Sequence, residues 1–204
     1  MTGAGSDELN HRTRLAESRS ILELALASAR RPCLSSRFGP YSAVFLHLVT
    51  RHVPDVPVIR VDTGYDTRAT RAFVDELRER LSLDLHIVRP RDHTLRVPPA
   101  IDDPEHAAFV ETVKLEPFRR ALAALDCDVW LSSVRRYQSV HRASLEPFEP
   151  LSHGRLKVSP MLGWSEATLE RYAREHGLPR GPDVFDPTKG EPFRECGLHT
   201  ALGA

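Results

Sequence analysis

Short apolar runs alternate with segments of helical spacing along most of this chain, and this alternation limits the possible folds more than any other feature. The strand-like runs lie around Leu34 and at residues 56–61, 83–88 and 128–132. The helical patterns occupy residues 7–30, 42–51, 67–81 and 107–125. Strand and helix alternating in this way favour parallel strands joined by crossover helices. We therefore predict an α/β fold: a single domain with a doubly wound, mainly parallel sheet flanked by helices.

Polar residues directly follow three of the predicted strands. Ser35, Asp62 and the segment Ser132 to Arg136 stand at these positions. The carboxyl ends of parallel strands meet at one edge of a sheet, and ligands of doubly wound folds bind beyond that edge. The sequence therefore predicts that these three segments converge on one crevice.

The turn after the first strand has the composition of a phosphate-binding loop. Its serines supply hydroxyl donors, its glycine allows close approach of an anion, and the helix that follows offers unpaired N–H groups. Pro40 suits a first helical turn. A Ser/Gly turn before a helix is also common as a purely structural feature. The candidate binding residues are Ser35, Ser36, Arg37, Phe38 and Gly39.

Asp62, Thr63 and Gly64 follow the second strand. A carboxylate and a hydroxyl beside a glycine suit a ribose or an adenine amino group. An Asp at this place is equally compatible with capping the helix that begins near Thr67. Both interpretations stay open at the level of sequence.

A basic cluster follows the fourth strand. Arg135, Arg136 and Arg142 lie within eight residues, and planar guanidinium groups match the oxygens of phosphate and sulfate. The alternative is a solvated charged surface. Gln138 and Ser139 lie inside the cluster and complete the predicted binding set.

The last dozen residues contain one cysteine, Cys196, in a polar segment that follows a Pro- and Gly-rich stretch. Such a stretch cannot form a helix or a central strand, so we expect a mobile tail over residues 179–204. Thiolate is the nucleophilic form of cysteine, and the neighbouring Arg194 and His199 favour it. The alternative is an incidental cysteine in a frayed end.

These motifs occur together in a known order. The loop at 35–39, the segment Asp62-Thr63-Gly64-Tyr65, the cluster 135–143 and the tail Glu195-Cys196-Gly197-Leu198-His199 resemble the phosphoadenylyl-sulfate (PAPS) reductases of the adenine-nucleotide alpha-hydrolase-like superfamily. The resemblance covers roughly residues 20–200, and the tail motif is its most specific part. It implies a helical segment at 1–30, a sulfonucleotide-binding domain at 31–178 and a catalytic tail at 179–204.

The resemblance also implies a reaction. Cys196 attacks the sulfur of PAPS, adenosine 3′,5′-bisphosphate leaves, and a thiol of thioredoxin or glutaredoxin then releases sulfite from the cysteine S-sulfonate. His199 would favour the thiolate or contact phosphate. Relatives are commonly dimers, so a homodimer is a further implied partner.

Composition bears mainly on cofactors and location. Three cysteines cannot supply the four thiolates of a bound iron–sulfur cluster, so we expect no cluster and no other bound metal. With 28 basic and 28 acidic residues the net charge is zero, which argues against nucleic acid and membrane surfaces as partners. The sequence shows no signal-like or membrane-spanning apolar run, and we expect a cytoplasmic protein. Cys33 and Cys127 are interpreted as small apolar residues beside strands.

Two departures from the family leave alternatives open. Arg37 stands where relatives more often have a small residue, and only residues 180–194 separate Pro179 from the Glu195-Cys196 motif, where relatives have a longer insert. A diverged adenylyl-sulfate reductase that supplies sulfite to a specialised pathway is one alternative. A non-catalytic nucleotide-binding relative is the other. An ATP pyrophosphatase of the same superfamily is disfavoured, because the loop lacks paired glycines and an Asp.

Overall fold

A computed structural model describes residues 3–91 and 97–189 of the chain. The described residues form a six-stranded sheet with the strand order β3-β2-β1-β4-β6-β5. The strands are β1 (Pro32–Ser35), β2 (Val58–Val61), β3 (Leu85–Val88), β4 (Val129–Leu131), β5 (Phe148–Pro150) and β6 (Leu156–Val158). Every pairing is parallel except that of β5 with β6. The predicted α/β fold with a mainly parallel sheet is confirmed.

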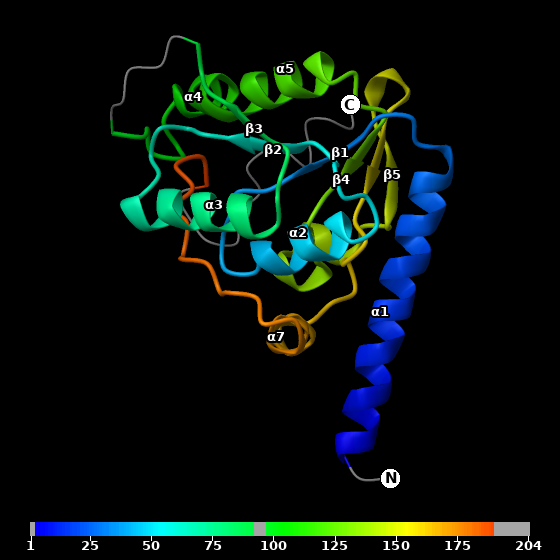
Figure 1. The fold of residues 1–204 in the computed structure, drawn as a ribbon. Coiled ribbons are helices and arrows are strands. Elements are labelled where there is room, and N and C mark those ends of the chain that lie inside the picture. The colour runs from blue at the N-terminus through cyan, green and yellow to red at the C-terminus, as the bar shows by residue number, and fades with distance from the viewer. Residues whose placement is uncertain (1–2, 92–96, 190–204) are drawn as a thin grey trace.

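Helices cover both faces of the sheet (Figure 1). One face carries the helical run made of α4 (His106–Val110), η1 (Glu111–Leu115) and α5 (Glu116–Ala124), and the other carries α2 (Ser42–Thr50) and α3 (Arg68–Arg80). The remaining elements are α1 (Gly3–Ser28), η2 (Arg136–Gln138), α6 (Val140–Ala143), η3 (Ser152–Gly154) and α7 (Glu166–Glu175). The first four predicted strands and the four predicted helical segments are confirmed, with ends that differ by a few residues.

The helix predicted over residues 107–125 contains a π-helical turn at Glu111–Leu115. Pro117 lies at the start of the α-helix that follows. Proline has no N–H and its ring crowds the carbonyl four residues earlier, so a regular α-helix cannot run through it undisturbed. The wider π turn accommodates this defect and keeps the run continuous.

β5, β6 and α7 were not predicted. β5 and β6 have three residues each, and β6 places Lys157 in a buried strand. Lys157 pairs with Glu149 of β5 at 2.7 Å and lies over the Trp130 ring at 5.8 Å. β6 reads Leu-Lys-Val, and three residues are too few for an alternating pattern to predict a strand, so its position became visible only in the folded sheet.

α1 packs on the domain along most of its length, since the buried His11 lies 3.1 Å from Glu175 of α7, while its N-terminal end projects beyond the body (Figure 1). Leu22 and Ala25 are buried in the main apolar core. The buried Ser18 hydroxyl donates to the Pro160 carbonyl at 2.7 Å and accepts from the Trp164 indole at 2.7 Å. The predicted N-terminal helical segment is thus part of the same packed unit as the sheet.

Candidate active site

The loop after β1 is held open by three local contacts. Phe38 has a left-handed backbone (φ 58°) and a fully buried ring, and its N–H donates to the Ser36 hydroxyl at 3.1 Å. Ser35 accepts a hydrogen bond from the Trp130 indole at 2.9 Å. Ser42, the first residue of α2, donates its N–H to the Gly39 carbonyl at 3.0 Å. Phe38 therefore anchors the loop from below, and the serine side chains and Gly39 face the cavity described next.

A cavity of about 410 Å³ lies at the carboxyl ends of β1, β2 and β4. The strand order reverses at β1, because β2 and β3 extend to one side of it and β4, β6 and β5 to the other. A reversal of this kind opens a crevice between the crossover connections, and this is where doubly wound sheets bind ligands. The predicted residues that line the cavity are Ser35, Ser36, Arg37, Gly39, Thr63, Arg135, Gln138 and Arg142.

Five predicted residues lie outside this lining: Phe38, Asp62, Gly64, Arg136 and Ser139. Ser139 caps α6 by accepting from the Arg142 N–H at 3.3 Å. Arg136 donates to the Leu145 carbonyl at 3.0 Å and lies 4.0 Å from Glu146. Arg136 and Ser139 thus contact other parts of the protein, although Arg135, Gln138 and Arg142 of the same cluster line the cavity.

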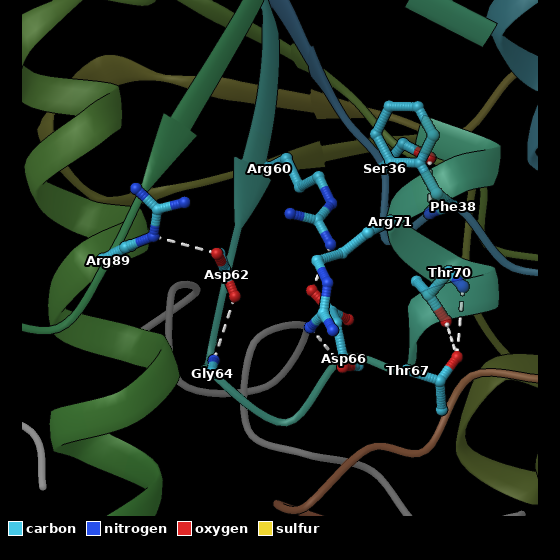
Figure 2. A network of polar contacts seen from close by, with 10 residues as sticks. All are labelled: Ser36, Phe38, Arg60, Asp62, Gly64, Asp66, Thr67, Thr70, Arg71 and Arg89. Atoms are coloured by element: carbon cyan, nitrogen blue, oxygen red, sulfur yellow. Dashed lines mark hydrogen bonds and ion pairs between the residues drawn. The ribbon is translucent and has the colours of Figure 1, made fainter. Parts of the chain in front are cut away.

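The Asp62 carboxylate is turned toward Arg89 (Figure 2). One oxygen lies 2.9 Å from the Arg89 Nε, and the other accepts the Gly64 N–H at 3.0 Å. Burial opposes ionisation of this carboxyl, but the Gly64 and Arg89 hydrogen bonds outweigh it, so the pKa of Asp62 lies below its usual value. Asp62 does not cap α3. The N-cap is Thr67, whose hydroxyl accepts from the Thr70 N–H at 3.1 Å.

The wall after β4 concentrates positive charge. Arg135 donates to the Ser133 carbonyl at 2.8 Å and stacks on Tyr137 at 5.6 Å. The buried Arg142 donates to Gln138 Oε1 at 2.6 Å, and the same oxygen accepts the Arg135 N–H at 3.0 Å. Desolvation, with Arg142 and Arg37 nearby, lowers the pKa of Arg135 from its ordinary value. Arg135 and Arg142 thus bring two guanidinium groups to the cavity wall that follows β4.

Sequence reasoning missed a second cation and its partner. Lys114 from η1 lies 2.5 Å from Asp186, and both residues line the cavity. Asp186 also accepts from the Thr188 hydroxyl at 2.6 Å and lies 3.6 Å from Arg37. Burial opposes ionisation of Asp186, but Lys114 and the Thr188 hydrogen bonds dominate and lower its pKa to about 2. Lys114 and Asp186 are 72 residues apart, so no local sequence pattern could have predicted their contact.

We call residues 180–189 the C-terminal arm. It crosses the loop after β1, where the Gly181 N–H donates to the Pro40 carbonyl at 3.0 Å. Asp183, Val184, Phe185 and Asp186 from this arm line the cavity. The start of the predicted tail therefore forms part of the cavity wall. Cys196 and His199 lie outside the described residues.

The other two cysteines are buried. Cys33 and Cys127 lie together in an apolar cluster with Phe118 and Trp130. A hydrogen bond to Cys127, followed by burial, raises the pKa of the Cys33 thiol well above its usual value. The Cys127 thiol donates to the Val129 carbonyl at 3.2 Å. A buried thiol in apolar surroundings is a poor nucleophile. Within the described ranges no three His, Cys, Asp or Glu side chains are grouped as metal ligands would be.

Comparison with known proteins identifies the family to which the chain is similar. A family model described as a phosphoadenosine phosphosulfate reductase domain matches residues 31–182. A phosphoadenosine 5′-phosphosulfate reductase of Cronobacter sakazakii is 35% identical over 228 residues, covering 91% of each chain. One of Alkalilimnicola ehrlichii is 40% identical over 159 residues, and the match covers 74% of this chain and 64% of that protein.

Solved structures support the fold. A phosphoadenylyl-sulfate reductase from Candida auris in a phosphate complex matches with a TM-score of 0.69 at 21% identity, covering 89% of this chain and 90% of that one. A U34-tRNA thiolase from Methanococcus maripaludis, with its [4Fe-4S] cluster, matches with a TM-score of 0.63 at 14% identity, covering 90% of this chain and 70% of that one. The matched family model covers all six strands of the sheet and the whole loop after β1, and the resemblance to this family is confirmed. The chain belongs to the phosphoadenosine phosphosulfate reductase family.

Proposed function

We propose that this protein reduces 3′-phosphoadenylyl sulfate to sulfite and adenosine 3′,5′-bisphosphate, with Cys196 as the nucleophile. The observation that carries the proposal is the cavity at the strand ends. It combines the hydroxyls of Ser35 and Ser36 with the guanidinium groups of Arg135 and Arg142. A molecule with phosphate and sulfate groups needs this kind of charge-assisted donor.

In the first chemical step the Cys196 thiolate attacks the sulfur of the sulfate group. A new S–S bond forms, the bond from sulfur to the bridging phosphate oxygen breaks, and the nucleotide leaves with that electron pair. Negative charge develops on the departing phosphate. Arg142 and the hydroxyls of Ser35 and Ser36 can stabilise this charge without reorganisation, since the fold already holds them at the cavity wall.

The second step needs a dithiol reductant, which we propose to be thioredoxin or glutaredoxin. One of its thiolates attacks the Cys196 sulfur, sulfite leaves with the electrons of the S–S bond, and a mixed disulfide forms. The second thiol of the reductant then breaks that disulfide and restores Cys196. Two electrons pass from the dithiol to the sulfonate sulfur in each cycle.

The C-terminal arm limits how far Cys196 can lie from the cavity. Asp186 and Thr188, which precede Cys196 by ten and eight residues, tie the arm to Lys114. Ten residues span at most roughly 35 Å, so Cys196 is tethered within reach of the cavity that the arm itself lines. The chain has three cysteines, and two are buried with each other, so we also propose that it binds no iron–sulfur cluster.

The test is intact-mass spectrometry after incubation with 3′-phosphoadenylyl sulfate without reductant, followed by sulfite release on adding thioredoxin. We expect one added sulfonate on Cys196. Cys196→Ser should carry none and should form no sulfite, yet still bind adenosine 3′,5′-bisphosphate. Cys127→Ala is the matched control and should keep both the adduct and turnover. Sulfite formation by Cys196→Ser at the wild-type rate would refute the proposal.

A further inference from the structure

Trp130 of β4 donates a hydrogen bond to a serine of the cavity from behind the cavity lining. Its ring is fully buried, and its indole Nε1 lies 2.9 Å from Ser35 Oγ. Ser35 is the last residue of β1 and lines the cavity. The two residues are 95 positions apart and meet because β1 pairs with β4. Trp130 was not among the predicted site residues, since an apolar residue inside a strand gives no sign of such a contact.

Two further contacts fix the position of the indole ring. The Phe118 ring centre lies 4.8 Å from that of Trp130, with the ring planes at 58°. Lys157 Nζ, which is buried and paired with Glu149, lies 5.8 Å from the centre of the indole ring. A cation over an indole ring is attracted by its π electrons. The direction of the indole N–H is therefore set by the packing around the sheet and does not depend on a ligand.

This N–H determines what the Ser35 hydroxyl can offer to the cavity. An indole N–H only donates, so Ser35 accepts the bond with one of its two lone pairs and keeps its own O–H for another acceptor. Ser36 has the same arrangement, because its hydroxyl accepts the Phe38 N–H at 3.1 Å and it also lines the cavity. The oxygens of an ionised phosphate or sulfate group are acceptors, so two hydroxyls prepared as donors suit them.

Resting on the function proposed above, we propose that Trp130 is a positioning residue for the anion site. Its indole N–H fixes the Ser35 hydroxyl as a donor whose O–H is directed to a phosphate oxygen in the cavity. Without that N–H the hydroxyl rotates and presents a lone pair to the anion for part of the time. Hydrogen bonds in a chain polarise one another, so a Ser35 oxygen that donates to an anion also accepts more strongly from the indole.

The indole N–H signals of the unmodified protein test this coupling by nuclear magnetic resonance. The chain has two tryptophans, and Trp164 donates in the same way to Ser18 at 2.7 Å, at a place that does not line the cavity. Saturation of ¹⁵N-labelled protein with adenosine 3′,5′-bisphosphate should move the Trp130 proton to lower field and leave that of Trp164 in place. The spectrum of Trp164→Phe assigns the two signals. The shift should be absent in Ser35→Ala. A Trp130 signal that does not move overturns the proposal.

Trp130→Phe removes the N–H and keeps an apolar ring. A neutral hydrogen bond corresponds to roughly two- to tenfold in affinity, so we expect adenosine 3′,5′-bisphosphate to bind more weakly by about that factor in titration calorimetry. Trp164→Phe is the matched control, because it also removes a buried indole–serine hydrogen bond, and it should bind as the wild type does. Equal binding by the two variants would make the proposal wrong. The wild-type titration decides the question if Trp130→Phe does not fold.

A double variant separates positioning from a general packing role. Ser35→Ala removes the donor itself and should weaken binding by roughly ten- to hundredfold. Because Trp130 acts through Ser35, the variant with both changes should bind within about twofold of Ser35→Ala alone. Losses that multiply would show that Trp130 only supports the packing of the strands, and the proposal would fail.

These measurements also distinguish the positioning role from the proposed reaction. Coupled losses of affinity in a protein that forms no sulfite would refute the reaction and leave the role of Trp130 standing. Sulfite formation by a protein in which the two losses multiply would do the opposite. Failure to bind the nucleotide would overturn both.

Discussion

At the scale of single residues, neighbouring side chains in one motif serve different purposes. Arg135 and Arg136 are adjacent, yet Arg135 lines the cavity and Arg136 bonds to the Leu145 carbonyl. Asp62 is engaged by Arg89, whereas Asp66 four residues later reaches the cavity wall. The orientation of a side chain is set by its backbone position and by its hydrogen-bonding partner, and this orientation decides which polar groups can contact a ligand.

Arg135→Ala should lower kcat/KM for 3′-phosphoadenylyl sulfate by roughly ten- to hundredfold, because a charge-assisted contact contributes about 1.5–3 kcal/mol. If Arg135 holds the 3′-phosphate, adenylyl sulfate should lose much less. Steady-state kinetics with both substrates measure this. Arg119→Ala serves as the control, since Arg119 is an exposed residue of α5 paired with Glu111. An equal loss for both substrates would mean that Arg135 does not distinguish the 3′-phosphate.

The Asp186 carboxylate offers a second prediction for a single residue. Its pKa of about 2 lies below the ordinary 3.8, so it stabilises the fold above about pH 4 and loses this effect as the pH falls toward 2. Asp186→Asn should therefore lower the free energy of unfolding by about 2 kcal/mol at pH 7 and by clearly less near pH 3. Urea unfolding at both pH values measures the difference. A cost that does not change with pH would show that the charge of Asp186 contributes nothing.

At the scale of elements, the loop after β1 and the C-terminal arm form one structure. The arm bonds to Pro40 through Gly181, and Val184 lies 3.7 Å from the position of a Cβ on Gly39. The loop is held from below by Phe38 and from the side by the Trp130 indole. The shape of the anion site thus depends on a segment that follows it by about 140 residues.

Gly181→Ala should disturb this contact strongly. An added Cβ would lie 2.5 Å from the Phe73 ring and 2.6 Å from the Gly39 carbonyl oxygen, closer than real contacts allow. Part of the clash is with backbone, so the arm must move. We expect weaker binding of adenosine 3′,5′-bisphosphate, by at least roughly tenfold if one charge-assisted contact is lost.

Gly163→Ala is the matched control for that experiment. Its added Cβ meets only the end of the flexible Arg14 side chain at 3.0 Å, which can move away. Binding and stability of this variant should stay close to wild type. If the two glycine variants bind the nucleotide equally well, the arm does not support the loop.

At the scale of the whole molecule, α1, α2 and α7 meet at a cluster of aromatic and histidine rings. His47 of α2 lies 2.9 Å from the Tyr172 hydroxyl of α7, and its ring centre is 4.7 Å from that of His176. Trp164, bonded to Ser18 of α1, packs against Tyr172 at 5.5 Å. No helix in the described part of the chain has the length and apolarity to cross a bilayer.

Stability should depend on pH through this cluster. Burial, followed by the charges of His176, Arg51 and Arg80, lowers the pKa of His47 from 6.5 to about 4. The unfolded chain then binds the extra proton between these values, so the stabilising effect of neutral His47 is present above about pH 6.5 and lost toward pH 4. The free energy of unfolding falls as the pH is lowered from about 6.5 to about 4, and in His47→Gln this fall should be smaller. Urea unfolding at several pH values measures it. An unchanged slope would contradict the assignment.

The sequence alone determined the class of fold and the location of the site. The alternation of strand and helix patterns predicted the parallel sheet, and the polar residues after three strands predicted where ligands meet it. Both follow from local chemistry, since periodicity and chain breaks act over a few residues. The serines of the loop, Arg135 and Arg142 were predicted for this reason, and all of them line the cavity.

Only the tertiary structure decided which side chains complete the cavity. Lys114 meets Asp186 across 72 residues, and Asp62 turns to Arg89 across 27 residues. Each choice depends on the packing of elements that are distant in sequence, on burial that makes an unpaired charge costly, and on the direction of each side chain. These three conditions arise only when the chain has folded, so no local pattern could specify them.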